Sequence, residues 1–361
     1  MKVMTVMGTR PEIIKLSRIT PLLDKHFDHT IVFTNQNYTP EMSSIFFKDM
    51  KVRKPDYNLK IKTGQYGSEV ADIIKKSHDV MIKEKPDLLF LLGDVNSGLS
   101  ALSAANLGIK ITHIEAGMRS YDSRMPEERN RKIIDHLSSV NMVYTYNSKQ
   151  NLIREDVHSR SIYVVGNPIV EVLSHNVDRI EKSDILNHLD LTNKEYILVT
   201  SHRSENVDDP ETLKQIFKGL GEVYTKFQKL IIYPMHPRTS SKLINQKIPK
   251  GIKIIPPVGF FEFSKLEKYA FCIITDSGTV SEDASFFKTP CVTLRESTER
   301  PELIEIGSTI LSGLGTQKLV DSVMTITSSD KNWDWQKALG DGSTSQKVVN
   351  ILQGKIFETK L

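Results

Sequence analysis

Three acidic residues stand where apolar runs of the sequence end or where a helix is expected to begin. They are Asp94 in Leu92-Gly-Asp, Glu115 in His113-Ile-Glu, and Glu127 in Met125-Pro-Glu. A carboxyl group next to a buried strand lies against a low-dielectric wall, which raises its pKa and prepares it for proton transfer. Taken singly, Asp94 and Glu127 also suit helix caps, and Glu127 stands four residues before Arg131, the spacing of an ion pair. Together, the three carboxylates indicate acid/base chemistry.

A second set of residues suits a phosphate. The run Phe271-Cys-Ile-Ile-Thr-Asp-Ser-Gly-Thr predicts a strand that ends at Asp276 and a helix that begins near Ser277 or Gly278. Backbone N–H groups and the positive end of the helix dipole converge at such a turn, and glycine lets a phosphate approach. The pattern predicts a diphosphate-binding turn, with an ordinary N-cap as the alternative.

Cationic side chains follow the first predicted strand. In Gly8-Thr-Arg-Pro-Glu12, Pro11 suits the first position of a helix, and Lys15 lies about a turn after Arg10. Two cations on one helix can neutralise a leaving phosphate, although solvated side chains are the alternative.

Two histidines and an arginine-rich run complete the candidates. His202 follows the predicted strand Tyr196–Thr200, and His236 stands in Met235-His-Pro. Such a histidine can bond a phosphate or shuttle a proton, although a lone histidine is more often structural. The run Arg295-Glu-Ser-Thr-Glu-Arg-Pro-Glu302 predicts either a solvated loop or an ion-paired wall around ribose or phosphate.

Short apolar runs alternate with amphipathic stretches, which predicts an α/β fold with parallel sheets. The pattern loosens after Gly166 and restarts at Tyr196, so we expect one domain over 1–166, joined by a C-terminal helix within 345–361, and a second over 167–344. Ligands bind at the carboxyl ends of strands in such sheets. The remaining predicted strands are Lys2–Met7, Thr30–Thr34, Leu88–Leu92, Ile111–Ile114, Met142–Tyr146, Lys229–Tyr233, Ile252–Ile255, Phe271–Thr275 and Pro290–Leu294.

Composition narrows the function classes. The chain of 361 residues is 39% hydrophobic and 25% charged, its formal charge is +4, and it has no block of five or six like charges. These values argue against nucleic acid or membrane as a partner. The cysteines, Cys272 and Cys291, lie in apolar runs and suit buried thiols of a cytoplasmic protein. No zinc spacing, calcium loop or dinucleotide glycine pattern occurs, so we expect no metal and no NAD.

Seven motifs occur together in one order, and their set resembles the non-hydrolysing UDP-N-acetylglucosamine 2-epimerase family over about residues 1–350. The resemblance implies a glycosyltransferase-B-like fold of two Rossmann-type domains with UDP in a deep cleft. The motifs are Gly8-Thr-Arg-Pro-Glu12, Gly93-Asp94, His113-Ile-Glu-Ala-Gly117, Pro126-Glu-Glu-Arg-Asn130, His202-Arg203, Thr275-Asp-Ser-Gly278 and Thr298-Glu-Arg-Pro-Glu302.

The resemblance also assigns roles to residues. Asp94, Glu115 and Glu127 become the acid/base carboxylates, with His202 catalytic or in contact with phosphate. It implies a homodimer that acts on a UDP-sugar in the synthesis of surface polysaccharide precursors, without a separate cofactor. Its UDP-binding positions are Arg10, Lys15, Ser277 and Gly278, with Asp283 at the ribose. From their places in the sequence, we add His236 and Arg295 to the expected UDP-binding residues.

Two departures from the family pattern matter. Asp283 stands where members usually carry a ribose-binding Glu, and Ser204 stands where many carry an Arg of an allosteric substrate site. Motifs such as Gly259-Phe-Phe261 look more like the branch that acts on UDP-6-deoxy-L-hexosamines, whereas Glu115-Ala-Gly-Met-Arg119 is closer to the D-glucosamine branch. We expect the 6-deoxy-L substrate, with UDP-N-acetylglucosamine as the alternative.

The mechanism implied by the resemblance is elimination of UDP to a glycal, followed by its re-addition with inversion at C2. A hydrolysing epimerase, a glycosyltransferase of the same fold and an inactive UDP-sugar sensor are the alternatives. A sensor would lack the acidic trio, and all three acids are present here.

Overall fold

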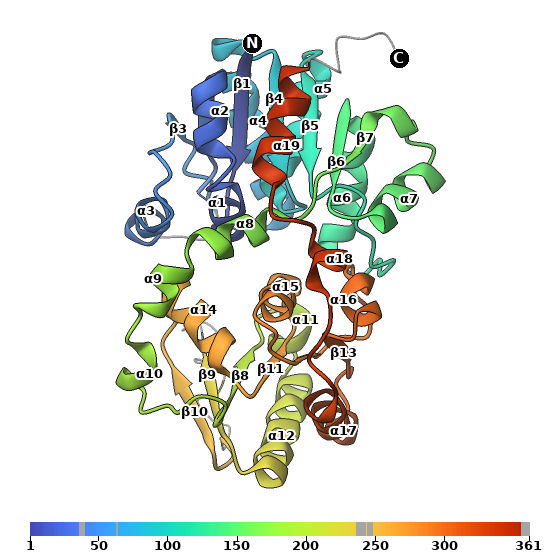
Figure 1. The fold of residues 1–361 in the computed structure, drawn as a ribbon. Coiled ribbons are helices and arrows are strands. Elements are labelled where there is room, and N and C mark those ends of the chain that lie inside the picture. Colours follow the sequence, from blue (N-terminus) through green and yellow to red (C-terminus); the bar gives the residue numbers. More distant parts are fainter. Residues whose placement is uncertain (36–39, 63, 236–242, 244–247, 355–361) are drawn as a thin grey trace. The chain divides into compact units, whose positions relative to one another are not determined.

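The computed structural model describes residues 1–35, 40–62, 64–235, 243 and 248–354 (Figure 1). The chain forms two compact units. Unit 1 comprises Met1–Val172 and Leu339–Leu361, and unit 2 comprises Leu173–Ala338. Helices α8 (Pro168–His175) and α18 (Trp335–Leu339) contain the two boundaries.

Unit 1 is built on a seven-stranded parallel sheet in the order β3-β2-β1-β4-β5-β6-β7. Its central strands carry apolar residues on both faces, as a parallel sheet covered by helices requires. The strands are β1 (Lys2–Met7), β2 (Asp28–Phe33), β3 (Tyr57–Asn58), β4 (Leu88–Leu92), β5 (Lys110–Ile114), β6 (Val140–Val143) and β7 (Ile162–Val164).

One face of this sheet packs against the helices that follow β3, β4 and β5, through residues such as Val6, Leu91, Met81, Ala104 and Ile134. The helical elements of unit 1 are α1 (Arg10–Leu16), α2 (Thr20–His26), α3 (Pro40–Asp49), α4 (Tyr66–Glu84), η1 (Asn96–Ser100), α5 (Ala101–Asn106), α6 (Pro126–Leu137), α7 (Tyr146–Arg154), η2 (Ser159–Ser161) and α19 (Thr344–Gln353).

Helix α19 follows unit 2 in the sequence but belongs to unit 1, where it packs beside α2 (Figure 1). Two of its residues make specific bonds to unit 1. The Thr344 hydroxyl donates to the Val165 carbonyl over 3.0 Å, and the Ser345 backbone N–H donates to Glu171 over 2.8 Å. The C-terminal helix therefore completes the N-terminal sheet domain.

Unit 2 repeats the design with a six-stranded parallel sheet in the order β10-β9-β8-β11-β12-β13. The alternating side chains of its central strand enter different cores, which shows that helices cover both faces: Ile197 and Val199 lie in one cluster, and Tyr196 and Leu198 in the other. The strands are β8 (Tyr196–Thr200), β9 (Leu230–Pro234), β10 (Ile252–Ile255), β11 (Cys272–Thr275), β12 (Cys291–Thr293) and β13 (Thr309–Leu311).

Helices α12 and α17 pack side by side over the first of these clusters (Figure 1). Gly219 permits their close approach, because a Cβ there would lie 3.0 Å from Leu319. The helices of unit 2 are α9 (Val177–Glu181), α10 (Ile185–His188), α11 (Ser204–Val207), α12 (Pro210–Phe227), α14 (Phe260–Tyr269), α15 (Gly278–Phe286), α16 (Pro301–Glu305) and α17 (Thr316–Ser328).

The predicted α/β class with parallel sheets is confirmed, and most strand predictions hold to within one or two residues. The prediction for Met142–Tyr146 is wrong at its end: β6 stops at Val143, and α7 begins at Tyr146 because Thr145 caps it by accepting a bond from the Ser148 N–H. Three strands were missed, namely β3, β7 and β13. They are two or three residues long and lie at sheet edges.

The strand order creates one topological switch point in each sheet. In unit 1, β1 lies between β2 and β4, and in unit 2, β8 lies between β9 and β11. The connections after the two strands at a switch point leave in opposite directions, and ligands bind outside the carboxyl ends there. The segments after β1, β4, β8 and β11 therefore hold the positions best suited to chemistry.

We predict that Gly340→Ala destabilises unit 1. Gly340 has a φ of +92°, and a Cβ would lie 2.8 Å from the backbone Cα of Gly166. The left-handed backbone alone costs about 1–2 kcal/mol for alanine, so the thermal unfolding midpoint should fall by several degrees. Gly67→Ala is the control, since a Cβ at Gly67 meets nothing within 4 Å. Equal midpoints for both variants would contradict the prediction.

Candidate active-site residues in the two units

Glu115 is the first residue after β5, and its backbone adopts the left-handed region with a φ of 73°. Its Oε2 atom accepts hydrogen bonds from Lys15 Nζ and from the Tyr144 hydroxyl, each over 2.8 Å. The Lys15 side chain is 2% exposed and that of Glu115 10%. A lysine on α1 and a tyrosine after β6 thus orient one predicted acid/base carboxylate, with its charge matched by a cation.

Asp94 is two residues beyond β4, after Gly93. Its Oδ2 atom accepts from Arg131 Nε over 3.1 Å and from Arg131 Nη2. Arg131 also donates to Glu128 over 2.7 Å, and its neighbour Asn130 donates to the Asp94 carbonyl over 2.9 Å. Helix α6 therefore positions Asp94 through both its side chain and its backbone.

The helix-cap alternative for Asp94 and Glu127 is wrong, because the N-caps of η1 and α6 are Val95 and Met125. Glu127 lies half-buried in the first turn of α6, where a helix dipole favours a negative charge. It therefore shares one helix with Arg131, which holds Asp94. These contacts link the elements that carry Asp94 and Glu127.

Glu12 is a buried carboxyl group that sequence reasoning did not single out. Its Oε2 accepts from the Gly8 and Thr9 N–H groups over 2.9 and 2.7 Å, and its Oε1 accepts from the Ser97 hydroxyl over 2.8 Å. Burial raises the pKa of Glu12 to about 7 against the opposing effect of these bonds. Glu12 ties the turn after β1 to the helical segment after β4, across the switch point.

Arg10 begins α1 with an exposed side chain, and its guanidinium carbon lies 5.7 Å from the centre of the Phe46 ring. Lys15, on the same helix, is buried against Glu115. The two cations of the first helix therefore have different surroundings: one is accessible and the other is committed to a carboxylate.

In unit 2, Asp276 gathers the donors at the switch point. Its carboxylate, 0% exposed, accepts from the Ser201 hydroxyl over 2.8 Å, the His202 N–H over 3.0 Å and the Arg203 N–H over 3.1 Å. Asn206 donates to it over 3.0 Å. These hydrogen bonds join the end of β11 to the segment after β8. The candidate residues His202 and Ser277 therefore stand on backbone with a fixed position.

The predicted phosphate turn has the expected strand-to-helix geometry. Helix α15 begins at Gly278, and Ser277 is its N-cap, with a side chain that makes no capping bond. The Ser277 hydroxyl is thus not used in the way the N-cap alternative requires. Gly278 lies close to the arginine-rich run: a Cβ there would lie 2.6 Å from Arg300 Nη1, so that side chain would have to shift.

The predicted ion pairing of the arginine-rich run is confirmed. Glu299 joins Arg295 over 2.7 Å and also joins Arg300, and Arg300 in turn joins Glu282 on α15. All four side chains are buried. Asp283, the predicted ribose-binding acid, is also buried on α15, next to Glu282. The run is therefore a packed wall beside the turn and not a solvated loop.

His202 is accessible, with 63% of its side chain exposed, and its Nδ1 lies 3.4 Å from Asp276 Oδ1. Asp276 can therefore orient the ring while leaving Nε2 available to a ligand. His236 lies outside the described residues.

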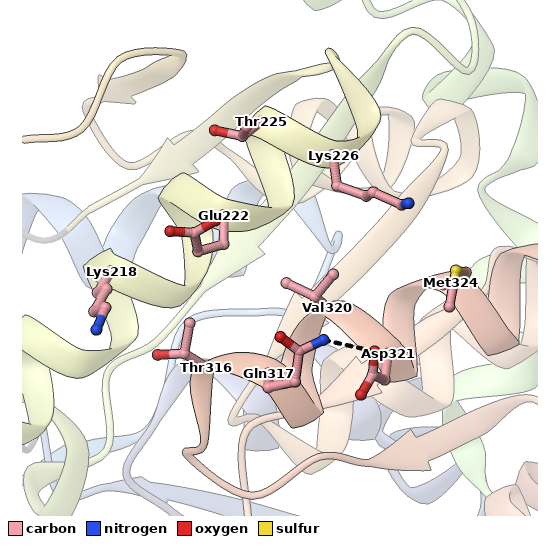
Figure 2. Close-up of a pocket in the computed structure, with 9 residues that line it drawn as sticks. All are labelled: Lys218, Glu222, Thr225, Lys226, Thr316, Gln317, Val320, Asp321 and Met324. Carbon is pink, nitrogen blue, oxygen red and sulfur yellow. Dashed lines mark hydrogen bonds between the residues drawn. The ribbon is translucent and has the colours of Figure 1, made fainter.

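A groove of about 840 Å³ lies between α12 and α17, with Lys218, Glu222 and Met324 among its lining residues (Figure 2). It contains none of the candidate residues.

Across the described part of the chain, no cluster of three His, Cys, Asp or Glu residues could hold a metal. None of the helices in that part is long and apolar enough to cross a membrane.

The residues missed by the sequence analysis are those that orient others. Tyr144 lay within a predicted strand and carried no motif, and Glu12 was read only as part of a turn. A glutamate three residues after Thr9 is the spacing of a capping box, and this signal could have identified Glu12. Nothing in the sequence near Tyr144 points to Glu115.

We predict that Glu12 makes stability depend on pH. A pKa of about 7 in the folded protein, against an ordinary 4.5, means that the folded state holds a proton that the unfolded state has lost between those values. The free energy of unfolding of the wild type, relative to that of Glu12→Gln, should therefore fall as pH rises from about 4.5 to about 7. The fall should be at most about 3 kcal/mol. Thermal unfolding across this range measures the effect. Asp79→Asn, at an exposed position of α4, is the control, and a pH-independent gap between wild type and Glu12→Gln would contradict the prediction.

Comparisons with known proteins show the family of the chain. The sequence model of the UDP-N-acetylglucosamine 2-epimerase family matches residues 22–353. A UDP-N-acetylglucosamine 2-epimerase of Methanocaldococcus jannaschii is 42% identical over 98% of this chain and 99% of its own. A UDP-2,3-diacetamido-2,3-dideoxy-D-glucuronate 2-epimerase of Pseudomonas aeruginosa is 33% identical, with 98% and 99% covered.

A crystal structure of the Methanocaldococcus jannaschii UDP-GlcNAc 2-epimerase in complex with UDP-GlcNAc and UDP superposes with a TM-score of 0.93. It is 41% identical and covers 98% of this chain and 100% of that one. The predicted glycosyltransferase-B-like fold class, with two Rossmann-type domains, is confirmed. The family model matches most of the chain, and the Methanocaldococcus jannaschii relative is 42% identical over nearly its whole length. This chain is therefore an isomerase that belongs to the UDP-N-acetylglucosamine 2-epimerase family.

Proposed function

We propose that the protein inverts C2 of a UDP-N-acetylhexosamine by eliminating UDP and adding it back. One observation carries the proposal: Asp94 and Glu115, at the carboxyl edge of the unit 1 sheet, are each held by a buried cation, Arg131 and Lys15. Carboxylates oriented in this way suit proton transfer at carbon, because a positioned base must meet its proton in a fixed geometry.

The elimination breaks the C2–H and C1–O bonds of the sugar and forms a C1–C2 double bond. A carboxylate takes the C2 proton, the electrons of that bond form the C1–C2 double bond, and the C1–O bond breaks as UDP leaves with its oxygen. In the return step a second acid gives a proton to the opposite face of C2, and a UDP oxygen bonds C1 again. Asp94, Glu115 and Glu127 are the proposed acid/base groups. Two faces of one ring need more than one such group, which three carboxylates satisfy.

The diphosphate carries the charge that develops on the leaving group. We assign it to Ser277 and Gly278 of the turn, His202 and Arg10, since donors aimed at a developing charge stabilise the transition state. Lys15 adds positive charge while it orients Glu115. Asp283, Arg295 and His236 complete the UDP assignments, with Asp283 at the ribose. The proposal needs no cofactor, and it keeps the homodimer that the resemblance implies.

The substrate is the finer part of the proposal. The names of the relatives favour UDP-N-acetylglucosamine, whereas the motifs Phe46-Phe-Lys-Asp49 and Gly259-Phe-Phe261 favour a UDP-6-deoxy-L-hexosamine. We place UDP-N-acetylglucosamine first and its 6-deoxy-L counterpart second. Both would serve the synthesis of surface polysaccharide precursors.

We predict that the protein incorporates one solvent deuteron at C2 of its substrate in deuterated water. Each UDP-sugar is incubated separately, and the recovered material is followed by NMR at C2. Reversible epimerisation returns both C2 epimers as deuterated UDP-sugars. Release of UDP with free sugar would indicate the hydrolysing alternative. Unchanged substrate from every UDP-N-acetylhexosamine tested, with UDP still bound, would favour the sensor.

We predict that Asp94→Asn and Glu127→Gln each slow C2 exchange by at least about 100-fold, the usual contribution of general acid/base groups. Binding of UDP, measured by calorimetry, should change little, because the UDP assignments lie mainly on unit 2. Asp79→Asn serves again as the exposed control. Exchange at the wild-type rate in both variants would remove these carboxylates from the mechanism.

A further inference from the structure

A buried histidine connects the two carboxylate-bearing segments of unit 1. His113 lies on β5, two residues before Glu115, and its side chain is 0% exposed. Its Nδ1 lies 2.7 Å from Asp135 Oδ1, and its Nε2 lies 2.8 Å from the Gly93 carbonyl oxygen. Gly93 directly precedes Asp94. The imidazole therefore bridges α6 and the turn that carries Asp94.

Both ring nitrogens of His113 have a hydrogen-bond partner. A carbonyl oxygen can only accept, so Nε2 donates to Gly93. Burial alone would raise the pKa of the Asp135 carboxyl, but His113 and Arg119 outweigh burial and hold that pKa below its ordinary value. Asp135 is the partner of Nδ1, so each ring nitrogen is engaged by a different segment of unit 1.

The charged groups around His113 are paired with one another. Arg119 Nη1 lies 2.8 Å from Asp135 Oδ2, and Arg119 Nη2 lies 2.6 Å from Glu155. The side chains of His113, Asp135 and Arg119 are all 0% exposed. Such a network is costly to bury unless every member is paired, and removal of one partner costs several kcal/mol. The network bonds to Gly93, directly before Asp94, and to Gly117, two residues after Glu115.

Asp135 reaches the second carboxylate segment as well. Its Oδ2 accepts from the Gly117 N–H over 3.2 Å, two residues after Glu115. Gly93 and Gly117 both have positive φ, +75° each, a conformation that glycine adopts without a steric penalty. Asp135 lies one helical turn after Arg131, which holds Asp94.

We propose that His113 is a positioning residue for the epimerisation, and that its Nε2 bond to the Gly93 carbonyl fixes the direction in which Asp94 leaves β4. This rests on the proposed function of Asp94. Loss of the bond lets the turn relax. A displacement of about 1 Å at a reacting group costs on the order of 100-fold in rate.

Two neutral substitutions separate this bond from the role of His113 in packing. The amide nitrogen of asparagine occupies about the place of Nδ1 and keeps the bond to Asp135, whereas that of glutamine occupies about the place of Nε2 and keeps the bond to Gly93. Both substitutes carry a neutral amide. We expect His113→Gln to keep most of kcat for C2 exchange, and His113→Asn to lose on the order of 100-fold with KM nearly unchanged.

Hydrogen exchange supplies a readout that needs no activity. Backbone amides of residues 93–97 should exchange faster in His113→Asn than in His113→Gln, with UDP binding equal in both. If asparagine is the better substitute in both assays, or if the variants behave alike, His113 serves Asp135 and the proposal is overturned. If wild type exchanges no C2 proton while the amides behave as expected, the proposed function fails and the positioning of the turn survives.

Discussion

Helix α6 carries two opposite charges one turn apart, and the carboxyl edge of the unit 1 sheet depends on them. Arg131 binds Asp94 and Glu128, while Asp135 binds His113, Arg119 and the Gly117 N–H. A buried ion without a partner costs several kcal/mol, so each of these groups requires the others. The register of β4 and β5 against α6 is thereby fixed next to the proposed acid/base residues.

In unit 2, one buried carboxylate, Asp276, fixes the segments at the switch point. Asp276 gathers hydroxyl, amide and backbone donors from the segment after β8, and it leaves His202 accessible and Ser277 at the start of a helix. Such an arrangement suits binding, because it presents donors in fixed positions. At the corresponding edge of unit 1, Asp94 and Glu115 are each paired with a buried cation, an arrangement that suits proton transfer. The two sheets have the same strand order, apart from the seventh strand of unit 1. They differ in the charged residues at their switch points.

The sequence predicted the central strands because residues buried on both faces give unbroken apolar runs, as in Leu88–Leu92 and Tyr196–Thr200. The edge strands β3, β7 and β13 were missed because two or three residues give no pattern. The candidate carboxylates were visible from their places after strands. Their partners were not, because Lys15 and Glu115 are 100 residues apart and only the fold joins them. Tyr144 carries no signal of its own for the same reason.

The central claim is that the bond between C1 and the UDP oxygen breaks and forms again during epimerisation. A UDP-N-acetylglucosamine labelled with ¹⁸O in the oxygen that bridges C1 and the β-phosphorus tests it directly. If UDP leaves and returns, the β-phosphate oxygens exchange places, and recovered UDP-sugar carries part of the label in non-bridging positions, visible by ³¹P NMR. Label that stays entirely in the bridge after many turnovers of C2 inversion would contradict the account.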